Sequence, residues 1–152
     1  MRGVGASRTV RIVHSSLSIF GPVFVLAGWT MLVLIGMAVG RLSATFKRQL
    51  RPEDFALGES SAVPERLRVV NRNYMNLLEL PVLFYAITVI AFVTNAVSPL
   101  IVGLAWAYVL LRVLHSLIHA TYNHVLHRMI AFALSNVTLA TLWILVGRAL
   151  LR

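Results

Sequence analysis

The chain has 152 residues, of which 59% are hydrophobic and only 12% are charged, and it carries a formal net charge of +9. A soluble domain has nearer 25% charged residues, so this composition excludes that class and predicts a membrane protein. The basic residues flank apolar segments and do not follow an exposed helix, so we expect no nucleic acid partner. Cysteine is absent, which excludes disulfides and a catalytic thiolate of the protein.

The first predicted membrane span covers residues 17–40, which contain no charge and are long enough to cross a bilayer. Arg2, Arg8 and Arg11 precede it, as in a signal peptide, but the apolar run is too long for one. We therefore expect a retained anchor.

A long polar loop, residues 41–68, is predicted to follow this span. The next spans are predicted at residues 69–94, with a kink at Pro81, at residues 98–121, and at residues 129–150. Ser98 and Pro99 are typical of a helix start, as N-cap and first helical residue. The predicted fold is an all-α integral membrane protein, a bundle of four transmembrane helices that forms a single domain over residues 1–152.

Two spans carry polar residues on one helical face each, and every charge at mid-bilayer costs about 2.5 to 3.5 kcal/mol. Counting residues from the turn between these spans predicts which residues are level with each other. The three expected pairs are Glu79 with Arg112, Asn76 with His115, and Arg72 with His119. We expect this site to open toward the loops 41–68 and 122–128. Both loops are predicted to be cytoplasmic, because more basic residues flank the span ends on their side.

Three interpretations of these polar residues stay open at this point. Glu79 and Arg112 form a structural ion pair, or His115 and His119 bind a metal ion together with a histidine of the next loop, or the surplus of arginines binds an anion. Two nearby arginines oppose a divalent cation, so we expect no metal site. An anionic ligand fits the surplus of positive charge best.

The spacing Arg72-x3-Asn76-x2-Glu79-x-Pro81, followed by Arg112-x2-His115-x3-His119 and then Arg128, resembles the MAPEG superfamily of membrane proteins in eicosanoid and glutathione metabolism. The resemblance extends from residue 17 to the C-terminus and is closest to a bacterial branch, which implies the bacterial inner membrane. It implies a homotrimer in contact with membrane lipids, with glutathione as co-substrate bound between subunits near the cytoplasmic face.

The resemblance also implies roles for single residues. Arg128 is expected to be catalytic and to stabilise the glutathione thiolate, while the residues expected to bind glutathione are Arg72, Asn76, Glu79, Arg112, His115 and His119. The chain departs from the pattern at His119, where characterised eukaryotic members have a glutathione-contacting tyrosine, at Met129, where some have a serine, and at Met75, where an arginine is often found.

The implied function is that of a glutathione-dependent membrane transferase or peroxidase acting on lipophilic electrophiles that arrive from the bilayer. The alternative is a non-enzymatic trimeric membrane scaffold, or a binder of an anionic lipid or metabolite. His119 is the feature that keeps this alternative open, so the sequence leaves the question of enzymatic activity undecided.

Overall fold

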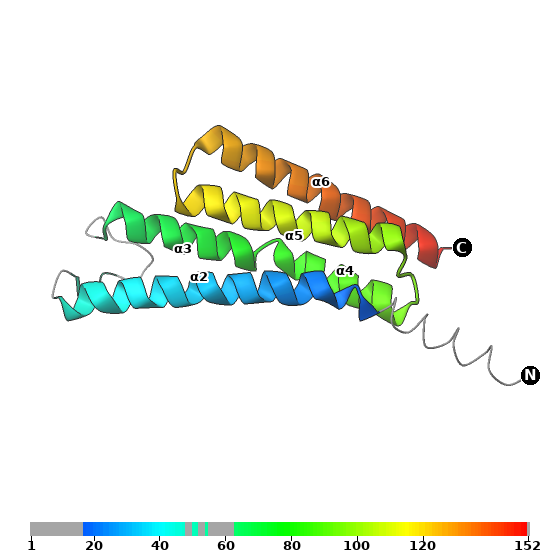
Figure 1. Ribbon diagram of the computed structural model, residues 1–152, viewed down its shortest axis with the longest axis horizontal. Helices are drawn as coiled ribbons and strands as arrows, with labels where there is room; N and C mark the ends of the chain where they lie inside the picture. Colours follow the sequence, from blue (N-terminus) through cyan, green and yellow to red (C-terminus); the bar gives the residue numbers. More distant parts are fainter. Residues whose placement is uncertain (1–16, 48–49, 52–53, 55–62, 152) are drawn as a thin grey trace, which may run out of the picture.

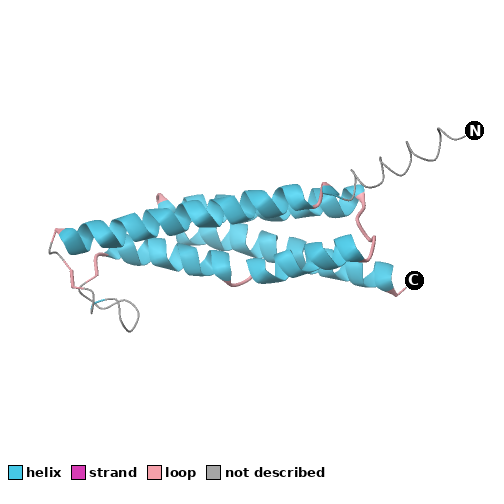
Figure 2. Cartoon of the chain, turned by 90° about the horizontal axis from the view of Figure 1, so that it is seen from below, coloured by secondary structure: helices cyan, strands magenta, loops and turns pink. Residues whose placement is uncertain are grey.

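The computed structural model describes residues 17–47, 50–51, 54 and 63–151, and the secondary structure in these residues is helical (Figure 1). The helices are α2 (Phe20–Phe46), α3 (Glu65–Leu78), α4 (Pro81–Val93), α5 (Pro99–Ala120) and α6 (Val125–Leu150). They lie side by side along one long axis in both views (Figures 1 and 2). Helices α3 and α4 follow each other along one span, so the described residues contain four segments long and apolar enough to cross a membrane.

Several boundaries differ from those predicted. Helix α2 continues to Phe46 and α3 begins at Glu65, so both ends of the predicted loop 41–68 are helical. The Arg41 side chain donates to Asn71 Oδ1 at 2.9 Å and joins these polar helix ends. Helix α6 begins at Val125, so most of the predicted loop 122–128 is its first turn, where the Arg128 amide bonds the His124 carbonyl. Arg2, Arg8 and Arg11, and most of the segment between α2 and α3, lie outside the described residues, so the predictions made for them stay predictions.

The second span breaks at Pro81, where the sequence predicted a kink. Helix α3 ends at Leu78, and α4 begins at Pro81, which has no backbone N–H to continue the helical bonds. After the break, α4 contacts α6, whereas α3 lies against α2 and α5. The span therefore has a polar half, α3, and an apolar half, α4.

The turns use the expected capping residues. The Ser98 side chain accepts a hydrogen bond from the Ile101 amide, and Pro99 is the first residue of α5, as predicted. Asn95 and Asn123 have φ angles of 55° and 47°, a left-handed conformation that asparagine adopts more readily than most residues. The chain thus reverses direction within a few residues between α4 and α5 and between α5 and α6.

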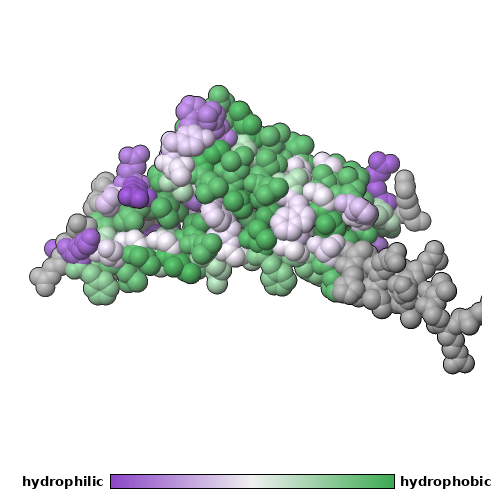
Figure 3. Space-filling view, viewed as in Figure 1, coloured by the Kyte–Doolittle hydropathy of each residue, from purple (hydrophilic) through white to green (hydrophobic). Residues whose placement is uncertain are grey.

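Apolar side chains fill the interior and also cover much of the outside. Phe84 of α4 stacks on Tyr108 of α5 with ring centroids 4.7 Å apart, within the buried cluster that contains Leu26, Leu142 and Val146. Many large apolar residues are exposed, and Figure 3 shows them over the middle of one face with hydrophilic residues mainly toward its two ends. This pattern matches a lipid-exposed bundle.

A buried polar contact joins three helices in the half of the bundle that contains α3. Ser116 Oγ of α5 accepts hydrogen bonds from Trp29 Nε1 of α2 at 2.9 Å and from Asn73 Nδ2 of α3 at 2.8 Å. Asn73 is 1% exposed and Ser116 is fully buried. Hydrogen bonds of this kind between membrane helices are worth about 0.6 kcal/mol on average and up to about 1.7.

We expect Ser116→Ala to lower the free energy of unfolding by about 1 to 2 kcal/mol, because two buried donors lose their acceptor. Thr138→Ala is the matched control, since Thr138 bonds only the Leu134 carbonyl of its own helix, and it should change stability by less than about 0.5 kcal/mol. Unfolding in detergent followed by circular dichroism measures both. Equal effects of the two substitutions would contradict the role of Ser116.

Candidate functional site

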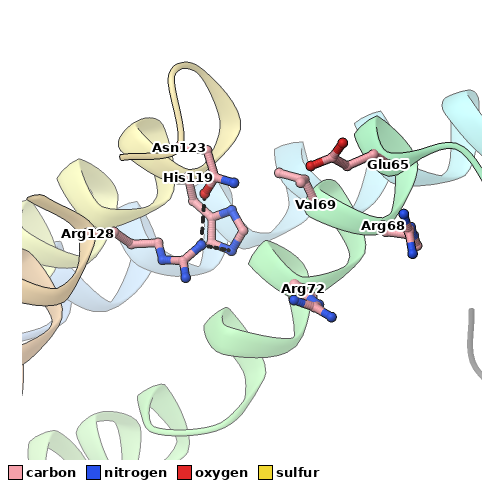
Figure 4. Close-up of a pocket in the computed structure, with 7 residues that line it drawn as sticks. All are labelled: Glu65, Arg68, Val69, Arg72, His119, Asn123 and Arg128. Carbon is pink, nitrogen blue, oxygen red and sulfur yellow. Dashed lines mark hydrogen bonds between the residues drawn. The ribbon is translucent and has the colours of Figure 1, made fainter. Parts of the chain in front are cut away.

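A cavity of about 180 Å³ lies where α3, the end of α5 and the start of α6 meet. We call it the arginine cavity, and Figure 4 shows the residues that line it: Glu65, Arg68, Val69, Arg72, His119, Asn123 and Arg128. The lining thus contains three arginines and one glutamate. Arg68 Nε is buried without a hydrogen-bond partner, so part of this positive charge is unsatisfied within the described chain. An anion that enters the cavity would find donors ready to bind it.

Arg128 is held in place by two neighbours of the α5–α6 turn. Its Nη1 donates to Asn123 Oδ1 at 2.8 Å and lies 3.2 Å from Nε2 of His119, as the dashed lines in Figure 4 show. An arginine only donates hydrogen bonds, so His119 Nε2 is the acceptor and the proton of the neutral ring is on Nδ1. His119 is 2% exposed. His119 therefore supports Arg128 from the protein interior. Its hydrogen bond fixes the orientation of one N–H group of Arg128.

A second cavity, of about 290 Å³, lies on the other side of Arg128. We call it the His115 cavity, and it is lined by Asn76, His115, Val125, Arg128, Met129 and Phe132. His115 Nδ1 donates to the backbone carbonyl of Arg128 at 2.9 Å, because that carbonyl can only accept. Its Nε2 is buried without a partner. Arg128 lines both cavities and so connects a strongly charged one with a more apolar one.

Arg112 lies in neither cavity. It is 1% exposed, and its Nη2 donates to the backbone carbonyl of Asn76 across the α3–α5 contact. Its Cζ lies 5.9 Å from the ring centre of Tyr108 and 5.5 Å from that of Phe132, both within cation–π range. Arg112 thus contacts a backbone group and aromatic rings.

Glu79 and Arg112, the predicted ion pair, make no direct salt bridge in the single chain, although the two charges lie close enough to attract each other. Glu79 is exposed, has no ion-pair partner among the described residues and lines neither cavity. It is the residue at which α3 ends, with a ψ angle of −87° that leaves the helical range. Depth counted along an unbroken helix places Glu79 level with Arg112, but α3 ends before Glu79, and the Glu79 side chain is exposed while Arg112 is buried.

The other two expected pairs meet at the site. Asn76 and His115 line the same cavity, and so do Arg72 and His119. Sequence reasoning missed three residues, Glu65, Arg68 and Asn123. Glu65 and Arg68 precede Arg72 at helical spacing, which is the signal that could have identified them. Both residues lie within the predicted loop 41–68. Asn123 had no such signal, because a turn brings it to the site.

His115 and His119, which the sequence offered as possible metal ligands, each form a hydrogen bond with Arg128 instead. The rings of His115 and His119 are 6.0 Å apart, and each contacts Arg128. Within the described part of the chain, no three histidine, aspartate or glutamate side chains are grouped closely enough to hold a metal ion.

Asn123 has to keep its left-handed backbone for Arg128 to be positioned. We expect Asn123→Ala to be less stable than Asn123→Gly by about 1 kcal/mol, because both remove the acceptor for Arg128 but only alanine is strained at positive φ. Thermal unfolding of the two variants in detergent measures this difference. Equal stability would show that the turn relaxes without cost.

A model of the MAPEG family matches residues 19–148, which include every residue of both cavities. No curated protein and no solved structure matches the chain.

Proposed function

The chain belongs to the MAPEG family, and on that premise we propose that it is a glutathione-dependent membrane transferase or peroxidase acting on lipophilic electrophiles. Family membership and the four apolar helices make it an integral membrane protein of glutathione and eicosanoid metabolism in the broad sense. The specific activity, the ligand and the assembly described below are our proposals.

The observation that carries the proposal is the charge pattern of the arginine cavity. Glutathione has two carboxylates and one ammonium group, and Arg68, Arg72 and Arg128 with Glu65 provide charges of the opposite signs. We propose Glu65, and not Glu79, as the acidic residue that binds the ammonium group, because Glu65 lines the cavity and Glu79 does not. Arg68 lines this cavity, and its Nε has no hydrogen-bond partner within the described chain.

Arg128 lies between this cavity and the His115 cavity, which supports its predicted catalytic role. With the charged ends of glutathione at Arg68 and Arg72, the thiol would lie near Arg128 and the partnerless Nε2 of His115. A cation in contact with the sulfur favours the thiolate, which is the nucleophile. The thiol proton goes to water when the thiolate forms. Attack by this thiolate on an electrophilic carbon then forms a sulfur–carbon bond, and either the leaving group departs with its electron pair or, in an addition, the neighbouring carbon receives the pair and takes a proton from water.

The apolar wall of the His115 cavity suits a lipophilic second substrate. Val125 and Met129 are exposed on α6, and Phe132 lies one turn further along. A molecule dissolved in the bilayer would reach Arg128 along these side chains. The substrate therefore need not pass through water.

We further propose a homotrimer in which a neighbouring subunit covers both cavities. Arg72 is exposed and Arg128 is half-buried, and charges in these positions would otherwise face hydrocarbon or headgroups without cover. The polar ends of the helices are proposed to lie on the cytoplasmic side, where glutathione is available.

The non-enzymatic alternative, binding of an anionic lipid or metabolite, is favoured by the environment of His119. This side chain accepts a hydrogen bond from Arg128, so one donor of the proposed catalytic residue is already occupied. Binding of glutathione without formation of the thiolate would support this alternative.

We expect bound glutathione to ionise at lower pH than the reference thiol, whose pKa is about 8.5, by about 1 to 3 units because Arg128 stabilises the anion. The thiolate band in the ultraviolet should be present near neutral pH in the wild type. In Arg128→Ala it should appear only as the pH rises toward the reference value.

Arg148→Ala, at the other end of α6, is the control and should leave this titration unchanged. An unshifted titration in the wild type, with glutathione bound, would contradict the proposed role of Arg128.

We expect Arg68→Ala and Arg72→Ala each to raise the dissociation constant for glutathione about tenfold or more, since a hydrogen bond to a charged group contributes about 1.5 to 3 kcal/mol. The thiolate band of the bound fraction should persist. Arg66→Ala is a matched control on the same helix, because Arg66 lines a different groove, between α2 and α3.

Titration calorimetry measures all three variants. An equal loss in Arg66→Ala would indicate a general attraction of anions, and the site assignment would then be wrong.

A further inference from the structure

The break in the second span leaves a backbone carbonyl without its helical partner. In a continuous helix, the Leu80 amide would bond the carbonyl of Asn76. Here α3 ends at Leu78, the Glu79 amide bonds the carbonyl of Met75, and no described backbone amide bonds the carbonyl of Asn76; the amide hydrogen that Pro81 lacks would have gone to Leu77. An unpaired carbonyl in the membrane costs several kcal/mol, so Asn76 needs a donor from elsewhere.

Arg112 of α5 supplies that donor. Its Nη2 bonds the Asn76 carbonyl, and its positive charge lies at the negative end of the α3 dipole. Two of its other nitrogens, Nε and Nη1, are buried without partners, and the guanidinium faces the rings of Tyr108 and Phe132. The described residues thus give Arg112 one strong hydrogen bond, and it goes to the end of α3.

We propose that Arg112 is a positioning residue that caps α3 at its break and thereby directs Asn76 into the His115 cavity. It does not contact the ligand, because it is 1% exposed and lines neither cavity, whereas Asn76 and Phe132 line the His115 cavity directly. This assignment replaces the expectation that Arg112 binds glutathione. The test of this role by glutathione affinity rests on the proposed function, but the test by hydrogen exchange does not.

The test is a double-mutant cycle between Arg112 and Pro81. Pro81→Ala lets the helix continue, so that the Leu80 amide bonds the Asn76 carbonyl, which then no longer depends on Arg112 for a donor. Arg112→Gln should raise the dissociation constant for glutathione about tenfold in the wild-type background and less than about twofold in the Pro81→Ala background. Arg112→Lys keeps a donor and a charge, and should retain most of the affinity; it is also the variant to use if Arg112→Gln does not fold. The same loss in both backgrounds would show direct ligand binding and overturn the proposal.

A second arm needs no ligand. Hydrogen exchange of the amides at the C-terminal end of α3 should be about tenfold faster in Arg112→Gln than in the wild type, while exchange in α6 stays unchanged. If this acceleration is seen but glutathione does not bind, the capping role stands and the proposed function fails. If exchange at the end of α3 does not change, the capping role is wrong even where glutathione binds.

Discussion

The hydrogen bond from Arg112 to the Asn76 carbonyl is the interaction on which the polar end of this bundle depends. Hydrocarbon offers no water to the Asn76 carbonyl, which the end of α3 leaves without its helical partner, so α5 has to provide a donor. With that donor in place, the second span bends inside the bundle. Its polar half lies along α2 and α5 and its apolar half reaches α6. The two cavities lie at the polar half, beside the start of α6.

The site separates charge from apolar surface over a short distance. The arginine cavity has more positive than negative side chains, and the His115 cavity has an apolar wall of Val125, Met129 and Phe132. Arg128 lines both, and the α5–α6 turn fixes it through Asn123 and His119. A molecule with charged ends and a reactive sulfur matches this arrangement, which is why we favour glutathione.

The sequence predicted the parts of the structure that local chemistry dictates. Apolar runs located the spans, Pro81 located the break, and Ser98 with Pro99 located the start of α5. Helical spacing also brought Asn76 to His115 and Arg72 to His119. Helical spacing did not predict the position of Glu79 correctly. The torsion angles at the break, and not the helical period, decide where this side chain lies. The sequence places Glu65 and Arg68 in a loop because the residues there are polar. In the structure they belong to α3, which begins before the apolar run. Asn123 could not be found, since only the turn brings it to Arg128.

The central claim is that a glutathione site at the polar end is completed by a second copy of this chain. Native mass spectrometry of the protein released from mild detergent, with and without glutathione, tests it most directly. We expect trimers that carry glutathione and monomers that carry none. A monomer that retains glutathione would contradict it, because the two cavities would then be sufficient within one subunit.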